Sequence, residues 1–225
     1  MEFLEKFTPA ENYLILENSN ATLKELLKLT MLDLLLKKVI TMEIVVVKSD
    51  ERSPERILTY VQSGVYFESY QAKSHEEIFL LPFQADPENK ILLKHLVKMS
   101  YNEAESMRNF VYHLILNHSE TSNLFETGKM FRNIRLNDAG RRAKIQIGKD
   151  LNELKSAVIN DTAVLTKVNG NLFLINNLES RTGSTGYRGY YRAFSSDFDS
   201  AFDSSAATPG NTWFGGWGSD SLTGK

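Results

Sequence analysis

Hydrophobic positions near the start of the chain recur at the three- and four-residue spacing of a helix. Thr8 to Glu11 (Thr-Pro-Ala-Glu) is a capping box, in which the Thr hydroxyl satisfies a free N–H and the Glu side chain reaches back. It predicts a short helix to about Glu17. Thr22 to Glu25 repeats the capping box and opens a Leu-rich helical region. The apolar positions of this region are Leu23, Leu26, Leu27, Met31, Leu34, Leu35 and Val39.

The Leu-rich stretch from Thr30 to Ile40 is apolar around most of its circumference, which predicts a buried helix. Replacement of Leu35 by Ala is therefore expected to cost roughly 2–5 kcal/mol of stability. Lys37 and Lys38 are expected to be replaceable at little cost.

Three runs of apolar residues predict extended structure. Residues 41–47 and 56–61 are rich in β-branched residues and flank a charged turn, and residues 77–81 form a third run. The first two runs predict a pair of neighbouring strands.

The element order then repeats in outline. Asp86-Pro87 predicts a helix start, and Ser100 to Glu103 is a third capping box, opening a helix to about Asn117. Leu136 to Ala139 leads into a long helix that ends near Val158. Residues 163–168 and 171–175 flank Asn169-Gly170, a type I′ hairpin signal.

Helices followed by a hairpin therefore occur about twice, which is roughly the element order of a winged helix. We expect an α+β, mostly helical fold with two winged-helix-like units packed together. The first unit spans residues 1–85 and the second spans residues 86–180.

The composition changes sharply near residue 180. Residues 181–225 contain no Val, Ile or Met, one Leu, and eight of the 13 glycines. Such a segment has too little aliphatic surface to offset backbone ordering, so it predicts a disordered tail that is dispensable for folding. Its nine aromatic residues are many for a passive linker. The candidate interaction residues in this tail are Phe194, Phe198, Phe202, Trp213 and Trp217.

The overall composition narrows the class of protein. A formal charge of −2 gives no global attraction to nucleic acid, and the absence of Cys excludes disulfides and thiolate chemistry. The longest apolar stretches are shorter than the roughly 20 residues of a membrane span, and the first residues do not resemble a signal peptide. We therefore expect a soluble, cytoplasmic protein.

The strongest local charge lies between residues 132 and 149, where six basic residues face one acid. Clustered guanidinium groups could bind phosphates or carboxylates. A solvated helix face is the favoured interpretation, and an anionic ligand, nucleic acid or a protein partner are the alternatives. The candidate anion-binding residues are Arg132, Arg135, Arg141, Arg142, Lys144 and Lys149.

No catalytic, metal or cofactor site is predicted. His113 and His118 are five residues apart, rather than the four that would place two ligands on one helix face. The folded part contains neither a nucleophile elbow nor a phosphate-binding loop.

Two families resemble parts of this chain. Residues 8–47 and residues 130–180, which include Leu136 to Arg141, are similar to an uncharacterised bacterial family with winged-helix-like units and a Gly/Ser-rich, often Cys-rich, C-terminal tail. The tail of the present chain has no Cys. The helical units are more distantly similar to the Golgi phosphoprotein lipid-binding family. Both resemblances imply a fold and no particular activity.

These observations favour a non-enzymatic protein- or peptide-interaction module. The alternative is a winged-helix DNA-binding regulator that uses the Arg132 to Lys149 region. An enzyme ranks third, because spacing alone does not place a pair of catalytic carboxylates.

Overall fold

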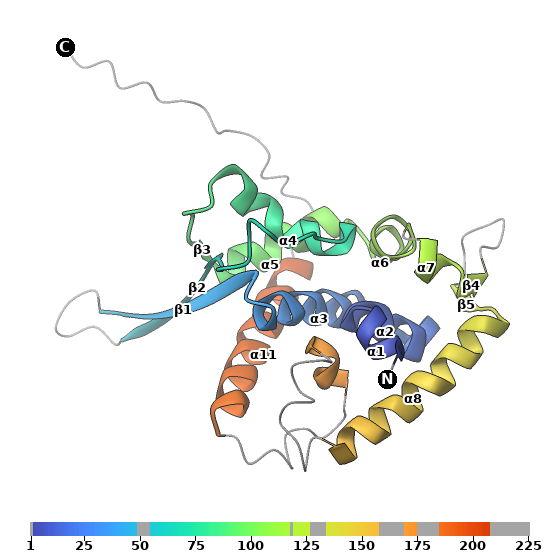
Figure 1. The fold of residues 1–225 in the computed structure, drawn as a ribbon. Helices are drawn as coiled ribbons and strands as arrows, with labels where there is room; N and C mark the ends of the chain where they lie inside the picture. The colour runs from blue at the N-terminus through green and yellow to red at the C-terminus, as the bar shows by residue number, and fades with distance from the viewer. Residues whose placement is uncertain are drawn as a thin grey trace.

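The computed structural model describes residues 2–48, 55–117, 119–126, 134–157, 169–174 and 185–207. In these ranges the chain is mostly helical, with one three-stranded and one two-stranded antiparallel sheet (Figure 1). The expected α+β class is therefore confirmed. None of the helices in the described ranges has the length and apolar character needed to cross a membrane.

The second and third α-helices of the chain begin where the capping residues Thr8 and Thr22 predict. The backbone N–H of Thr8 donates to Glu11 Oε2 over 2.7 Å, and Thr8 Oγ1 accepts from the Glu11 N–H over 3.3 Å. Thr22 Oγ1 accepts from the Glu25 N–H in the same way. In chain order, the first elements are α1 (Glu2–Lys6), α2 (Pro9–Glu17), the short 3-10 helix η1 (Asn18–Asn20) and α3 (Leu23–Leu36).

Helix α3 ends earlier than expected, in a Schellman motif. Lys38 adopts a left-handed backbone with φ of 54°, and its N–H donates to the Leu35 carbonyl. The Val39 N–H donates to the Leu34 carbonyl, and both of these apolar side chains are buried. This reversal turns the chain directly into β1. The expected burial of the Leu-rich stretch is confirmed for Met31, Leu32, Leu34 and Leu35.

The predicted pair of strands is confirmed. Strands β1 (Ile40–Val47) and β2 (Arg56–Ser63) pair antiparallel along their whole length, with Val46 opposite Ile57. The two strands together are called the ribbon below. The short strand β3 (Ile91–Leu92) pairs with the inner end of β2, so β1 is an edge strand of the sheet. The ribbon projects from the helical body (Figure 1).

The prediction of a strand at residues 77–81 is wrong, because these residues lie in α4 (Ser74–Ala85). Glu76 Oε2 accepts the Lys73 N–H over 2.8 Å at the start of this helix. Pro82 has no N–H for the carbonyl of Ile78, four residues earlier, but the Ser100 hydroxyl donates to that carbonyl over 3.4 Å. A proline is therefore tolerated inside this helix.

The prediction of a helix start at Ser100 is also wrong. Ser100 does not open a helix, because it lies within α5 (Leu93–Ala104). The helix expected from Asp86-Pro87 also begins later, since Ile91 and Leu92 pair with β2 as β3. A cap is present further along, where Ser106 Oγ accepts from the Asn109 N–H. The next elements are α6 (Met107–Asn109), the π-helical turn η2 (Phe110–Ile115), α7 (Ser119–Ser122), β4 (Phe125–Glu126) and β5 (Arg135–Leu136).

The long helix expected after Leu136 is confirmed as α8 (Asp138–Ala157). The hairpin expected after it is wrong where the structure describes it, since residues 169–174 form the 3-10 helix η3 (Asn169–Leu174). Gly170 is required there by close approach, because a Cβ would lie 2.7 Å from Pro9 Cγ and 2.8 Å from Asp33 Oδ1. Residues 163–168 lie outside the described ranges.

The prediction of a disordered tail is wrong for residues 185–207, because Thr185–Ala206 forms helix α11, which packs against α5 and α3. Three aromatic side chains replace the missing aliphatic surface: Phe194, Phe198 and Phe202 are buried at successive turns of the helix. The Phe202 ring meets Tyr101 of α5 edge-on, with centroids 5.1 Å apart. The rest of the predicted tail lies outside the described residues.

Both predicted units contribute to one hydrophobic core. Helix α8 packs against α1 and α2, and η3 packs against α2 and α3. The core thus lies between the first helices and segments from the second half of the chain. The boundary at residue 85 stays a prediction.

Candidate functional site

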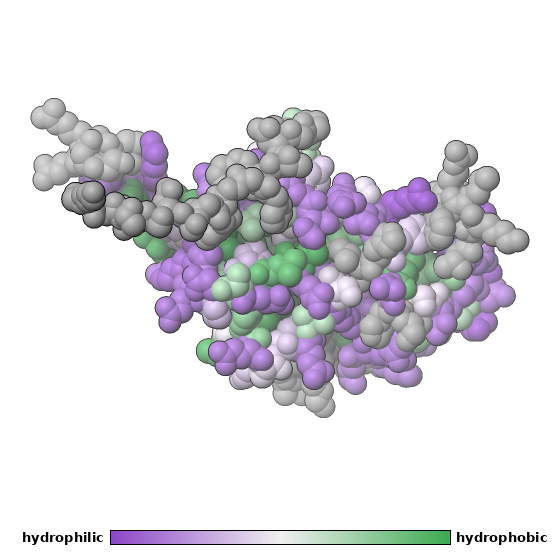
Figure 2. Space-filling view, turned by 90° about the horizontal axis from the view of Figure 1, so that it is seen from above, coloured by the Kyte–Doolittle hydropathy of each residue, from purple (hydrophilic) through white to green (hydrophobic). Residues whose placement is uncertain are grey.

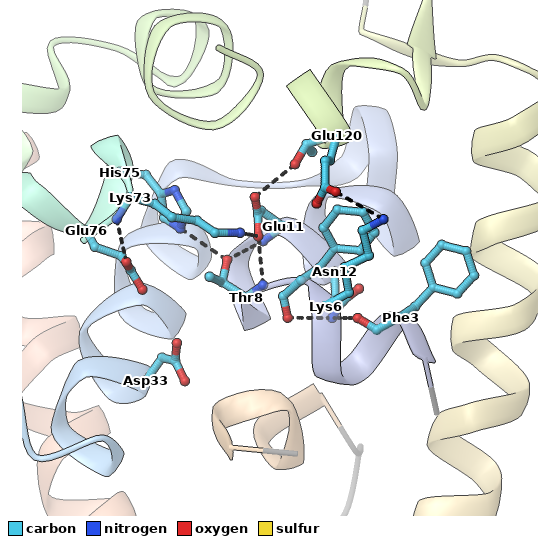
Figure 3. Close-up of polar contacts among 12 residues, drawn as sticks. Phe3, Lys6, Thr8, Glu11, Asn12, Asp33, Lys73, His75, Glu76 and Glu120 are labelled. Atoms are coloured by element: carbon cyan, nitrogen blue, oxygen red, sulfur yellow. Dashed lines mark hydrogen bonds and ion pairs between the residues drawn. The ribbon is translucent and has the colours of Figure 1, made fainter. Parts of the chain in front are cut away.

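A cluster of ionisable side chains lies where α2, α3 and the start of α4 meet, with four of its members buried and the two lysines partly buried (Figure 3). We call it the charge cluster, and its members are Glu11, Asp33, Lys37, Lys73, His75 and Glu76. Sequence analysis missed it, although capping boxes mark two of its acids, Glu11 and Glu76.

Glu11 is the centre of one half of the cluster. Lys73 Nζ lies 2.6 Å from Glu11 Oε2, which also accepts the Thr8 N–H, and the Thr121 hydroxyl donates to Oε1 over 2.8 Å. Burial would raise the pKa of Glu11, but the nearby His75 and Lys73 and the hydrogen bonds lower it below the usual value of 4.5. Glu11 is therefore an ionised, fully bonded carboxylate that joins α2 to α4 and α7.

His75 is fully buried beside Glu11. Its Nε2 lies 3.1 Å from Thr8 Oγ1, and its ring meets Phe110 edge-on at 6.5 Å between centroids. Burial lowers the pKa of His75 below 6.5, although Glu11 and Glu76 act in the opposite direction. The imidazole is therefore neutral near pH 7.

Lys37 is the centre of the other half. Its Nζ lies 2.6 Å from Asp33 Oδ2, 2.9 Å from the Tyr70 hydroxyl and 3.5 Å from Glu76 Oε1. Burial and the nearby Glu76 raise the pKa of the Tyr70 phenol well above its usual range, although Lys37 acts in the opposite direction. The expectation that Lys37 is replaceable at little cost is revised, since its ammonium group is bound to two buried carboxylates.

Asp33 connects this half to the distant segment η3. The Gly170 N–H donates to Asp33 Oδ1 over 3.1 Å, across 137 positions of sequence. Beside it, Asn12 Nδ2 donates to Asn171 Oδ1 over 2.9 Å, and Asn171 Nδ2 donates to the Leu4 carbonyl over 2.7 Å. Buried polar bonds thus attach η3 to α1, α2 and α3.

Each of the six carboxylate oxygens of Glu11, Asp33 and Glu76 has a hydrogen-bond or ion-pair partner within the described part of the chain. The side chains of all three acids are buried. This arrangement suits a network that positions helices, since a general acid or base has to reach a substrate.

The candidate anion-binding residues are spread over two elements. Arg135 lies on β5, while Arg141 on α8 pairs with Asp138 and also donates to the Leu136 carbonyl over 2.8 Å. Arg142, Lys144 and Lys149 are exposed on α8. Arg132 lies outside the described residues.

The candidate tail residues fall into two groups. Phe194, Phe198 and Phe202 are buried in the core, so they are used within the chain and are not exposed for a partner. Ion pairs fasten the same helix, with Asp199 Oδ1 2.9 Å from Lys28 Nζ and Asp203 Oδ1 2.9 Å from Lys24 Nζ. Trp213 and Trp217 lie outside the described residues.

The outer half of the ribbon carries an exposed apolar surface that sequence analysis did not identify. Ile44, Val46 and Ile57 are 57%, 58% and 70% exposed. They share one face, because Ile44 and Val46 are two residues apart and Ile57 lies opposite Val46. Some hydrophobic surface of the ribbon is visible at the left of Figure 2. The signal was present in the β-branched run itself, but exposure depends on how far the ribbon projects.

Comparisons of this chain with protein-family models, with curated proteins and with solved structures found no match.

Proposed function

We propose that this protein is a non-enzymatic protein- or peptide-interaction module that binds an extended segment of a partner along the outer edge of β1. The observation that carries the proposal is the projecting ribbon, with a hydrogen-bonding edge and an aliphatic face on its outer half. An extended peptide can add to such an edge through main-chain hydrogen bonds, while pockets or apolar patches select its side chains.

The aliphatic face supports this function because it continues the core. Val61 of β2 is buried and lies opposite Met42, which packs against the core. Two residues further out on each strand, Ile44 and Thr59 follow, and then Val46 and Ile57. A partner that lies on this face extends an existing apolar layer. Fewer side chains then have to be ordered when the partner binds.

A winged-helix-like arrangement of α2, α3 and the sheet is part of the proposal. In it the ribbon takes the place of the wing. The buried α3 then acts as a support, since Met31 and Leu34 have no exposed surface.

Affinity capture tests the proposal. The wild-type chain, the double variant Ile44→Lys/Val46→Lys and the matched control Ile145→Lys are immobilised, and retained proteins are identified. Ile145 is 62% exposed on α8, so its replacement introduces a similar charge elsewhere. We expect at least one protein to be retained by the wild type and the control but lost with the ribbon variant. Equal retention by all three chains would overturn the proposal.

DNA binding through α8 is the second candidate function. Arg142 and Lys149 are both exposed and lie seven residues apart, two turns along one face of the helix. Phosphate binding by this face predicts a steep loss of affinity with salt and a loss of binding in Arg142→Glu/Lys149→Glu. Fluorescence anisotropy with labelled duplex DNA at low salt measures both, and a flat titration with the wild type would eliminate this candidate.

A further inference from the structure

We propose that, while no partner segment is bound, β1 pairs antiparallel with β1 of a second copy of this chain, about a two-fold axis through Val45. This inference rests on the proposed function of the same edge, and it names what occupies that edge in the protein alone.

The edge of β1 lacks the features that usually prevent strand pairing. Natural edge strands are protected by Lys, Pro, bulges or covering segments. Strand β1 pairs with β2 without a bulge and contains neither Lys nor Pro. Its one charge, Glu43, is engaged by Lys90, whose Nζ lies 2.6 Å from Glu43 Oε2. No strand covers the outer side of β1 in the part of the chain that the structure describes.

The sequence of β1 is complementary to itself in one register. Residues that lie opposite each other in an antiparallel pair share a face, so the two-fold axis has to pass through a residue. With the axis at Val45, Ile44 lies opposite Val46 of the second copy, and Val46 lies opposite its Ile44. Each of these residues thereby meets an aliphatic side chain that the single chain leaves exposed.

Charges do not oppose this register. Glu43 lies opposite Val47 of the second copy, and Lys48 lies opposite its Met42, so like charges do not face each other. The exposed Ile57 of each copy lies beside its own Val46, which joins the two aliphatic faces into one surface. The contact area of two strand edges is small, so we expect a weak dimer that a partner segment displaces.

Cysteine cross-linking tests the pairing directly, because the chain contains no cysteine of its own. A residue on the axis lies opposite its own copy, at a Cβ separation close to that of a disulfide. We expect Val45→Cys to form a covalent dimer on mild oxidation with diamide. The matched control is Val47→Cys on the same face of the strand. It lies four positions from its own copy in this register, on the order of 13 Å along the strand.

The control also separates pairing from random collision. Val47 is an exposed residue, whereas Val45 is partly buried, so collisions would favour Val47→Cys. A mixture of Glu43→Cys and Val47→Cys chains is expected to form the mixed dimer. Cross-linking of Val45→Cys that is no faster than that of Val47→Cys would overturn the inference.

Sedimentation measurements distinguish this inference from the proposed function. We expect a concentration-dependent dimer for the wild type and for Ile145→Lys, and a monomer for Ile44→Lys/Val46→Lys, which places lysines opposite lysines. If the wild type is a monomer at every concentration but the ribbon variant still loses a captured protein, the second copy is eliminated and the interaction module stands. If the wild type dimerises and every captured protein is retained equally by the three chains, the dimer stands and the partner-binding function fails.

Discussion

Ser100 and Pro82 form a compensating pair at the contact between α4 and α5. Pro82 leaves the Ile78 carbonyl without a helical N–H, and the Ser100 hydroxyl donates to it. Loss of that hydroxyl leaves a buried acceptor unsatisfied, so we expect Ser100→Ala to cost about 1–3 kcal/mol of unfolding free energy. In a Pro82→Ala background the cost should be smaller, because an alanine at this position supplies the missing N–H. Urea denaturation of the two single variants and the double variant measures this coupling, and equal costs in both backgrounds would contradict the contact.

Lys37 and Lys38 are adjacent residues with different surroundings. Lys37 binds the buried carboxylates of Asp33 and Glu76, while Lys38 is exposed after the helix end. Removing one partner of a buried ion pair costs about 3–5 kcal/mol, whereas an exposed substitution usually changes stability by less than about 0.5 kcal/mol. We therefore expect Lys37→Ala to lower the unfolding free energy strongly and Lys38→Ala to leave it nearly unchanged. Similar values for the two variants in chemical denaturation would show that the charge cluster does not depend on Lys37.

At the scale of elements, α11 shows how aromatic residues can order a segment that lacks aliphatic ones. Its buried phenylalanines recur every four residues, and Asp199 and Asp203 pair with Lys28 and Lys24 of α3. The prediction of disorder was based on the number of aliphatic residues, but a buried Phe side chain removes as much surface from water as a buried aliphatic one. Deletion of residues 181–225 is therefore expected to destabilise the protein, contrary to the expectation from sequence.

Single substitutions in α11 test this docking without removing the helix. We expect Phe198→Ala to cost about 3–5 kcal/mol, the usual range for a buried aromatic side chain. Ser196 is an exposed residue two positions away, and Ser196→Ala is expected to change stability by less than about 0.5 kcal/mol. Thermal and urea unfolding give both values. A Phe198→Ala protein as stable as the wild type would mean that α11 is not part of the core.

At the scale of the whole molecule, the charge cluster predicts how stability depends on pH. The pKa of His75 in the folded protein is below 6.5. As the pH falls, His75 therefore takes up a proton in the unfolded chain at a higher pH than in the folded protein. The contribution of neutral His75 to the free energy of unfolding is fully present above about pH 6.5. It is lost as the pH falls towards the pKa of the folded state, with a slope of at most about 1.4 kcal/mol per pH unit. The groups that face it are Glu11, Glu76, Lys73 and Lys37. The lowered pKa of Glu11 keeps that carboxylate's own contribution intact until the pH falls below 4.5.

The comparison of wild type with His75→Gln isolates this effect. The glutamine retains a polar group for Thr8 but does not titrate. We expect the wild type's unfolding free energy to fall more steeply than that of His75→Gln between pH 7 and pH 5. Urea denaturation at several pH values measures the difference, which also cancels the exposed His95. Parallel pH profiles would show that His75 is not held neutral by burial.

Local signals in the sequence were sufficient for the elements whose formation is decided locally. The capping residues Thr8 and Thr22 start α2 and α3, the β-branched runs form β1 and β2, and α8 begins after Leu136. Each of these depends on residues within a few positions of one another. The burial of the Leu-rich stretch also followed, because a helix that is apolar on most sides has to be covered.

The tertiary structure alone decided the rest. Residues 77–81 form a helix because Ile78, Phe79 and Leu80 face the core and Ser100, 22 positions from Ile78, satisfies the carbonyl of Ile78. Asn169-Gly170 does not form a hairpin because Asp33, 137 positions from Gly170, binds its N–H. The charge cluster likewise joins Glu11 to Lys73 and Thr121, 62 and 110 positions away. The free energy of these contacts comes from burial and from partners distant in sequence, which no local pattern contains.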